Sequence, residues 1–117
     1  MKKFLLLFVV LLVSITICTK INADDESMAC AYHILVPTEK DAIKLKNEIH
    51  SFEDFKYYAK EYSSCPSRRN GGNLGCFGRG QMVKPFEDAV FNGELETVSE
   101  PVQTQFGYHL IWITKRF

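Results

Sequence analysis

Hydrophobic and polar positions alternate with different periods along the chain, and each period predicts an element. Residues 29–36 form a run of small, aliphatic and β-branched residues, ACAYHILV, that stops at Pro37. Residues 108–114 are also apolar almost throughout, YHLIWIT. Short runs of this kind are typical of strands that are buried on both faces. We therefore expect one buried strand near the start of the folded region and another at its end.

Two helices are predicted between these strands. Thr38 and Asp41 have capping-box spacing, and Ser51 and Asp54 repeat that spacing. Apolar residues recur at helical intervals after each cap, which predicts one amphipathic helix per cap. These residues are Ala42, Leu45 and Ile49, then Phe52, Phe55, Ala59 and Tyr62. Pro66 follows the second helix and predicts a single helical turn.

The region after this turn is rich in glycine and predicts tight turns around a short strand. It contains the stretch NGGNLGCFGRG, and we place the strand at residues 74–77. It has neither the GxxxxGK[ST] nor the GxGxxG pattern of a phosphate-binding loop.

The remaining pattern predicts a helix, a strand and a turn before the last strand. The helix covers residues 84–91, with Pro85 in its first turn and Gly93 as a left-handed cap. The strand covers residues 97–102, and the turn covers residues 104–107. Helices inserted between strands in this order predict one α+β domain over residues 29–117.

Residues 1–23 have the pattern of a targeting segment. Lys2 and Lys3 precede an apolar run of 14 residues, whereas a membrane-spanning helix needs about 18 or more. We expect a signal peptide cleaved after Ala23, although an uncleaved anchor is the alternative. The mature protein would then be secreted, start with a flexible segment at residues 24–28 and have no stable membrane association. In an intracellular parasite, the destination would be a host cell.

Composition narrows the class of protein further. The chain has 117 residues, enough for one domain, and its 14 basic residues balance its 14 acidic residues. Without residues 1–23 the balance is 11 basic to 14 acidic residues. No basic field exists to attract nucleic acid, so we expect no nucleic-acid partner.

Cysteine usage leaves an odd count. Removal of Cys18 with the signal peptide leaves Cys30, Cys65 and Cys76, which cannot all pair within one chain. Such a count is too low for a disulfide-built scaffold, yet a Cys65–Cys76 bridge is compatible with an oxidising compartment. At least one free thiol is expected, and Cys65 is the candidate for a functional site.

Several polar residues could carry chemistry, and three alternatives remain open. His33 and His109 lie in the two buried strands, where paired imidazoles would have to be fully hydrogen-bonded. The first alternative is a zinc site, although no CxxC or HxxxH pair exists; the second is a Cys–His hydrolase. The third is a non-covalent site in an apolar pocket. The residues of these alternatives are His33, His109, Cys65, Cys76 and Thr104, with Leu74, Met82, Phe86 and Phe106 for the pocket.

Four motifs together resemble the parvulin-type peptidyl-prolyl cis-trans isomerases. They are YHILV at residues 32–36, SSCPS with GGNLGCF at 63–77, RGQMVKPFEDAVF at 79–91 and PVQTQFGYHLI at 101–111. The resemblance spans most of the chain and departs from the family at Asn73, where Asp is frequent. It implies a four-stranded antiparallel sheet surrounded by about four helices. It also implies isomerase activity on proline-containing proteins or peptides, without a metal or cofactor.

The resemblance assigns roles to individual residues. It implies that His33, Cys65, Thr104 and His109 form the catalytic group, with Cys65 acting by electrostatics and shape. It implies a proline pocket lined by Leu74, Gln81, Met82, Phe86 and Phe106.

Substrate preference depends on small basic clusters. Lys40, Arg68 and Arg69 could contact an acidic or phosphorylated residue, although a solvated surface role is the alternative. Members that act on phospho-Ser/Thr-Pro sites have a long basic loop where this chain has only Pro37 and Thr38. We therefore expect broad specificity. We also expect the protein to be a monomer. The alternative function is that of a secreted binding or chaperone module, which would hold proline-containing segments without significant turnover.

Overall fold

The computed structural model describes residues 26–117, so the predicted signal peptide lies outside the described residues. The strands are β1 (Met28–Val36), β2 (Asn73–Gly78), β3 (Val102–Thr104) and β4 (Gly107–Arg116). The helices are α2 (Glu39–Glu48), α3 (Phe52–Tyr62), the 3₁₀ helix η1 (Pro66–Asn70) and α4 (Lys84–Asn92). None of the helices in this part of the chain is long and apolar enough to cross a membrane.

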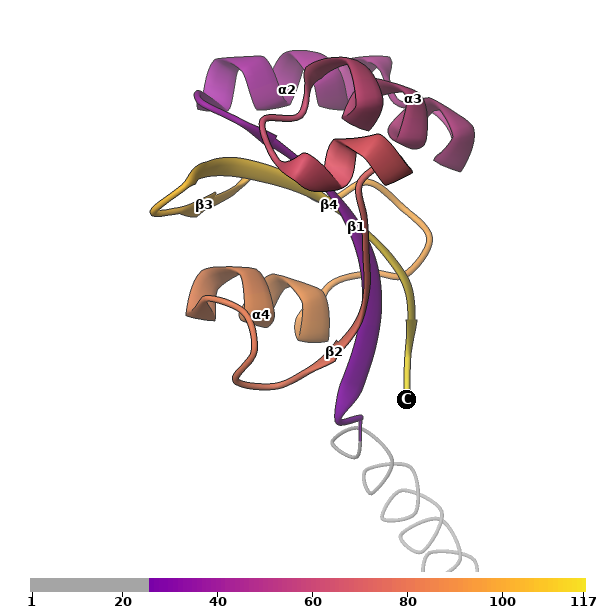
Figure 1. Cartoon of the computed structure of the whole chain (residues 1–117), viewed down its shortest axis with the longest axis vertical. Helices are drawn as coiled ribbons and strands as arrows, with labels where there is room; N and C mark the ends of the chain where they lie inside the picture. The colour runs from indigo at the N-terminus through magenta and orange to yellow at the C-terminus, as the bar shows by residue number, and fades with distance from the viewer. Residues whose placement is uncertain (1–25) are drawn as a thin grey trace, which may run out of the picture.

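The strands form one antiparallel sheet in the order β2-β1-β4-β3 (Figure 1). The long strands β1 and β4 pair at its centre, as their apolar character requires, and helices cover both faces. Helices α2 and α3 lie on one face, and α4 lies on the other (Figure 1). The predicted α+β class and the four-stranded antiparallel sheet are therefore confirmed.

Each sheet face has its own hydrophobic core because side chains alternate along β1 and β4. On the α2–α3 face, Ile34 and Leu110 pack with Phe55 and Trp112. On the α4 face, the cluster comprises Ala29, Ala31, Phe77, Phe86, Val90, Phe91, Ile111 and Ile113. His33 and His109 occupy buried positions of the same alternation as Ala31 and Ile111, so they face α4.

The predicted helix starts are confirmed by their caps. Thr38 accepts a hydrogen bond from the amide of Asp41, and Ser51 accepts one from the amide of Asp54. These hydroxyls satisfy amides that have no partner within the helix. The turn predicted at Pro66 is the 3₁₀ helix η1, which places residues 65–70 directly after α3.

The region between α4 and β4 differs from the prediction. Gly93 has φ −78° and is extended, so the left-handed cap expected there is wrong. A Cβ atom on Gly93 would lie 2.6 Å from the Ala89 carbonyl oxygen, so close packing explains the glycine. The strand expected at residues 97–102 is also wrong: Leu95 and Val98 form only isolated bridges with β4, and β3 starts at Val102. Glu96, which lies between these two bridges and just before the expected strand, has φ 59°.

The N-terminal boundary also differs. Met28 is the first residue of β1, and the amides of Ser27 and Met28 both donate to the Phe117 carbonyl oxygen. The part of the predicted flexible segment that the structure describes is therefore tied to the C-terminus.

Candidate active site

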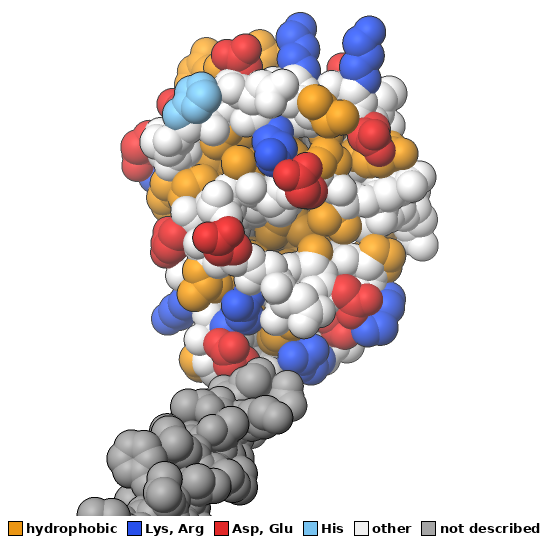
Figure 2. Space-filling model, turned by 180° about the vertical axis from the view of Figure 1, so that it is seen from behind, with side chains coloured by type: hydrophobic (Ala, Val, Ile, Leu, Met, Phe, Trp, Pro, Cys, Tyr) orange, Lys and Arg blue, Asp and Glu red, His pale blue; other side chains and the backbone are white. Residues whose placement is uncertain are grey.

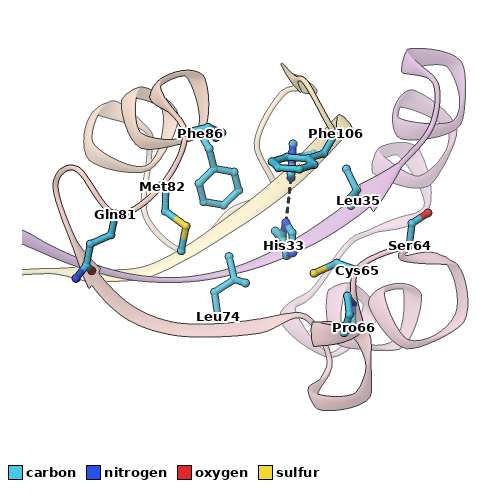
Figure 3. Close-up of a pocket in the computed structure, with 12 residues that line it drawn as sticks. His33, Leu35, Ser64, Cys65, Pro66, Leu74, Gln81, Met82, Phe86 and Phe106 are labelled. Carbon is cyan, nitrogen blue, oxygen red and sulfur yellow. Dashed lines mark hydrogen bonds between the residues drawn. The ribbon is translucent and has the colours of Figure 1, made fainter.

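Two buried histidines meet at the centre of the sheet. The Nδ1 atoms of His33 on β1 and His109 on β4 lie 3.0 Å apart, and their rings stack with centroids 5.2 Å apart (Figure 3). Both side chains are almost fully buried, at 5% and 4% exposure. The β1–β4 register produces this contact, because His33 pairs with Ile111 and His109 with Leu35, two positions along.

A hydroxyl completes the hydrogen bonding at each end of the pair. His33 Nε2 lies 3.2 Å from Ser67 Oγ, and His109 Nε2 lies 2.7 Å from Thr104 Oγ1. The amide of Phe106 donates to Thr104 Oγ1 at 3.1 Å. Since one Nδ1 must donate and the other accept, two neutral rings adopt opposite tautomers. One terminal hydroxyl then donates to its histidine and the other accepts, so the four side chains form one directional chain.

Burial keeps both imidazoles neutral. Loss of solvent lowers the pKa of His33 from 6.5 to about 4, and a charge on His109 would lower it as well. Burial likewise lowers the pKa of His109 to about 4. The charged forms are disfavoured because water is replaced by apolar neighbours. At neutral pH the pair therefore supplies dipoles and hydrogen bonds rather than positive charge.

An apolar pocket of about 480 Å³ opens beside the histidines. Phe86 forms one wall, with its ring edge-on to both imidazoles at centroid distances of 5.7 Å and 5.1 Å. Figure 3 shows Leu74 and Met82 on one side of His33, and Cys65 and Pro66 on the other. The residues that line the pocket are His33, Leu35, Ser64, Cys65, Pro66, Leu74, Gln81, Met82, Val83, Phe86, Phe106 and His109. A concave, mainly apolar site with a few convergent polar groups is suited to a small apolar group such as a proline ring.

The loop after α3 holds Cys65 against this pocket. Ser63 is buried, and its Oγ accepts from the amide of Leu35 at 3.0 Å and from that of Cys65 at 3.3 Å. The amide of Ser64 donates to the Leu35 carbonyl oxygen at 2.7 Å. These bonds tie the loop to the end of β1, and the thiol of Cys65 points toward His33 (Figure 3).

Gly72 allows the chain to pass close to His33. Its carbonyl oxygen accepts from the His33 amide at 2.9 Å, and a Cβ atom at this position would lie only 2.4 Å from the His33 carbonyl oxygen. Gly72 also has φ +89°, a conformation that other residues rarely adopt. The glycine density noted in the sequence is therefore needed here to position a site residue.

The structure brings most of the predicted site residues together. The proposed catalytic residues His33, His109 and Cys65 line the pocket, and Thr104 lies directly behind His109. All five residues predicted for the proline pocket line it as well: Leu74, Gln81, Met82, Phe86 and Phe106. Gln81 lies at the far side of the pocket from Cys65 (Figure 3), and its Oε1 accepts from the Gly78 amide at 2.7 Å.

The three predicted basic residues do not lie together. Arg68 and Arg69 line a second hollow, of about 380 Å³, next to the apolar pocket. Ser64, Cys65 and Pro66 line both. Lys40 is an exposed residue of α2 and lines neither hollow. Only the arginine pair is therefore placed to contact a ligand that enters the pocket.

Sequence reasoning missed Ser67 and Ser63. Ser67 belongs to the segment SSCPS, but nothing in the sequence alone shows that its hydroxyl reaches His33 rather than solvent. Ser63 sits at the end of α3, where a polar residue is ordinary, and its burial depends on the fold.

The cysteine pairing corrects the sequence-based alternatives. Cys30 and Cys76 face each other across β1 and β2 and form a disulfide, whereas Cys65 is free. The Cys65–Cys76 bridge is therefore wrong, because Cys76 lies on a strand paired with Cys30. The zinc alternative loses Cys76 for the same reason, and no cluster of three metal-ligating side chains occurs among residues 26–117.

The sheet, the paired histidines and the pocket define a small α+β domain with an apolar pocket beside a neutral hydrogen-bond network. The family model for the Rotamase, or PPIC-type PPIase, domain matches residues 33–115, so the chain belongs to the PPIC-type PPIase family. This finding confirms the resemblance to parvulins.

Relatives extend across bacteria and archaea. The foldase protein PrsA of Geobacillus sp. (strain WCH70) is 49% identical over 87 residues, which are 74% of this chain and 32% of the relative. The crystal structure of peptidylprolyl isomerase (PrsA) from Bacillus cereus has a TM-score of 0.73 at 45% identity and covers 79% of this chain and 36% of that chain. The solution structure of NmPin, the parvuline of Nitrosopumilus maritimus, has a TM-score of 0.68 at 41% identity and covers 76% and 97%. The chain thus spans about a third of the length of the curated relatives it matches.

Proposed function

We propose that this chain catalyses cis–trans rotation about X-Pro bonds in protein substrates, and thereby assists folding or switches conformation. The observation that carries this proposal is the apolar pocket beside two neutral, fully hydrogen-bonded histidines. Family membership supports it, because relatives are named peptidylprolyl isomerase and foldase.

The pocket suits the physical problem of this reaction. Resonance gives the C–N bond partial double-bond character, so rotation must cross a barrier of about 18–20 kcal/mol. The proline ring would fit between Leu74, Met82 and Phe86, and its imide would lose water there. Less water favours the twisted state, in which charge separation across the C–N bond is smaller. Contacts that are stronger in this twisted state than in either planar state lower the barrier.

The polar residues act on shape and electrostatics in this proposal. Rotation breaks no covalent bond, so Cys65 needs no nucleophilic role, and no metal or cofactor is required. The chain from Ser67 through His33 and His109 to Thr104 keeps the pocket wall in one geometry. Phe106, whose amide bonds to Thr104, is held at the rim by the same chain.

A peptide assay tests the proposal directly. The rate of cis–trans exchange of an Xaa-Pro peptide, followed by NMR line shapes with and without enzyme, should rise with enzyme concentration. Exchange at the uncatalysed rate, with the peptide nevertheless bound, would instead identify a binding or chaperone module. That second function is favoured by one relative, which is titled a SurA-like chaperone and has a TM-score of 0.73 at 37% identity.

Substrate preference is proposed to be broad, with a secondary contact to acidic residues. Arg68 and Arg69 adjoin the pocket and could attract an acidic or phosphorylated residue next to proline. Both are on the short helix η1, however, and no ion pair with another residue of the described part of the chain fixes either side chain. A phosphoSer-Pro peptide turned over a hundredfold faster than its unmodified partner would contradict broad specificity.

We further propose that the mature protein is a secreted monomer that acts on proteins rather than nucleic acid. The apolar run at residues 4–17 supports secretion, and a similar solved structure comes from a pair of SurA-like chaperones of Campylobacter jejuni, one of which is called periplasmic. The described surface also mixes charges of both signs, as the face in Figure 2 shows, so it offers no broad basic field there. N-terminal sequencing of the exported protein tests this proposal, and a start at Met1 would contradict it.

A further inference from the structure

A buried carboxylate outside the histidine network holds the loop that closes one side of the pocket. Glu87 lies in the first turn of α4, and only about a tenth of its side chain is exposed: 12%. Its Oε1 accepts a hydrogen bond from the amide of Gly80. Gly80 belongs to the connection between β2 and α4, residues 79–83, and this connection carries Gln81, Met82 and Val83 into the pocket lining.

The connection has no regular structure of its own, so a few side chains must define its shape. Gln81 Oε1 accepts from the Gly78 amide, and the Arg79 guanidinium lies 4.2 Å from the centre of the Phe91 ring on α4. The bond between Glu87 and Gly80 joins the middle of the connection to α4. Gly80 has φ +86°, and nothing lies within 4 Å of the place that a Cβ atom would occupy, so no packing on that side holds this residue in place.

The burial of Glu87 is informative because a carboxylate in such a position must be compensated. Lys84 Nζ is 3.8 Å from Glu87 Oε2 but bonds more closely to Asp88 Oδ1, at 2.6 Å. The Gly80 amide therefore donates a hydrogen bond to Glu87, whereas Lys84 lies beyond hydrogen-bond distance from it. Hydrogen bonds from an amide to a carboxylate are stronger than those between neutral groups, so one bond can fix a glycine.

Together these contacts connect Glu87 to two residues of the pocket lining that lie on different segments, α4 and the connection before it. Phe86, its neighbour in α4, packs edge-on to both histidines, while Met82 lies two residues after Gly80. We propose that Glu87 is a positioning residue, which sets the distance between Met82 and Phe86 through its bond to the Gly80 amide. It would act on substrate affinity rather than on the rotation step. This inference rests on the proposed function only in the nature of the ligand, a proline-containing peptide.

Two Glu87 variants and one neighbouring control test the inference. Glu87→Leu removes the acceptor at similar volume, whereas Glu87→Gln keeps an oxygen in place. Asp88→Asn removes a charge from the next residue, which is exposed and outside the pocket lining. We expect Glu87→Leu to raise KM for an Xaa-Pro peptide at least fivefold with kcat within twofold of wild type. Asp88→Asn should stay within twofold on both constants, whereas Glu87→Gln, which keeps an oxygen but loses the charge, should raise KM less than Glu87→Leu does.

Amide hydrogen exchange at Gly80 gives a readout that does not depend on activity. Gly80 is exposed, so its amide should be protected in the wild type only through the carboxylate, and Glu87→Leu should accelerate its exchange at least tenfold. A wild-type Gly80 amide that exchanges at the rate of an unprotected amide would overturn the inference, even if Glu87→Leu fails to fold. Equal losses in Glu87→Gln and Glu87→Leu would overturn it too. An inactive wild type with a protected Gly80 would contradict the proposed function alone, and peptide Kd would then replace KM.

Discussion

Acidification should destabilise the fold through the two buried histidines. In the folded protein burial lowers the pKa of His33 and of His109 to about 4, whereas an unfolded histidine titrates near 6.5. The neutral form is therefore favoured by folding. The stabilisation is fully present above pH 6.5, declines as the pH falls from 6.5 toward 4, and changes little below that value.

The size of the effect follows from the same shifts. Between pH 7.5 and pH 5.0 the unfolded rings take up protons that the folded rings, with pKa values of about 4, largely exclude. At 1.36 kcal/mol per pH unit over the interval from 6.5 to 5.0, each ring loses about 2 kcal/mol of stabilisation. The pair should lose about 4 kcal/mol, a large share of the stability of a small domain.

Urea denaturation at pH 7.5 and pH 5.0 measures this loss, because the midpoint shifts while the slope m stays constant. In the double variant with His33→Leu and His109→Leu, the free energy of unfolding should lose most of its dependence on pH. The matched control is His50→Gln, since His50 is exposed in the connection between α2 and α3 and lies outside the pair. The reasoning is refuted if wild type loses less than about 1 kcal/mol, or if the double variant loses as much as wild type.

Three further experiments test other parts of the structure. Cys65→Ser should keep isomerase activity within tenfold of wild type because no covalent step is involved, and a peptide adduct on Cys65 detected by mass spectrometry would contradict this. Gly72→Ala should destabilise by at least about 2 kcal/mol in urea denaturation, because its Cβ would lie 2.4 Å from a carbonyl oxygen, while Gly75→Ala, with nothing within 4 Å, should cost less. Replacing Cys30 and Cys76 with Ser should cost up to about 4 kcal/mol for a closed loop of this size, and an unchanged urea midpoint would show that the disulfide does not contribute.

Local signals in the sequence predicted the helices and the central strands well. The caps at Thr38 and Ser51 depend on residues three positions apart, so they are visible without any knowledge of the fold. The apolar runs around His33 and His109 predicted strands at the centre of a sheet for the same reason.

Features that depend on register or on one unusual φ were not predictable. The Cys30–Cys76 pair requires the β1–β2 register, which begins at Met28 opposite Gly78 and cannot be deduced from cysteine spacing. The left-handed φ of Glu96, a residue with no intrinsic preference for it, was not predictable either, and in the expected strand at residues 97–102 only Val98 and Val102 have ladder partners on β4. In the site, Ser67 could not be identified because its contact with His33 joins segments 34 residues apart.

The disulfide between β1 and β2 also changes the connectivity of the molecule. It joins residues 46 positions apart, and the segment between them contains α2, α3 and η1 with Cys65 and Ser67. Half of the site therefore belongs to a covalent ring. A single proteolytic cut within this ring would add only the mass of one water molecule. The two pieces of the chain would stay joined through the disulfide between β1 and β2. In a protease-rich extracellular setting, a nicked protein could thus keep its two halves together until a reductant separates them.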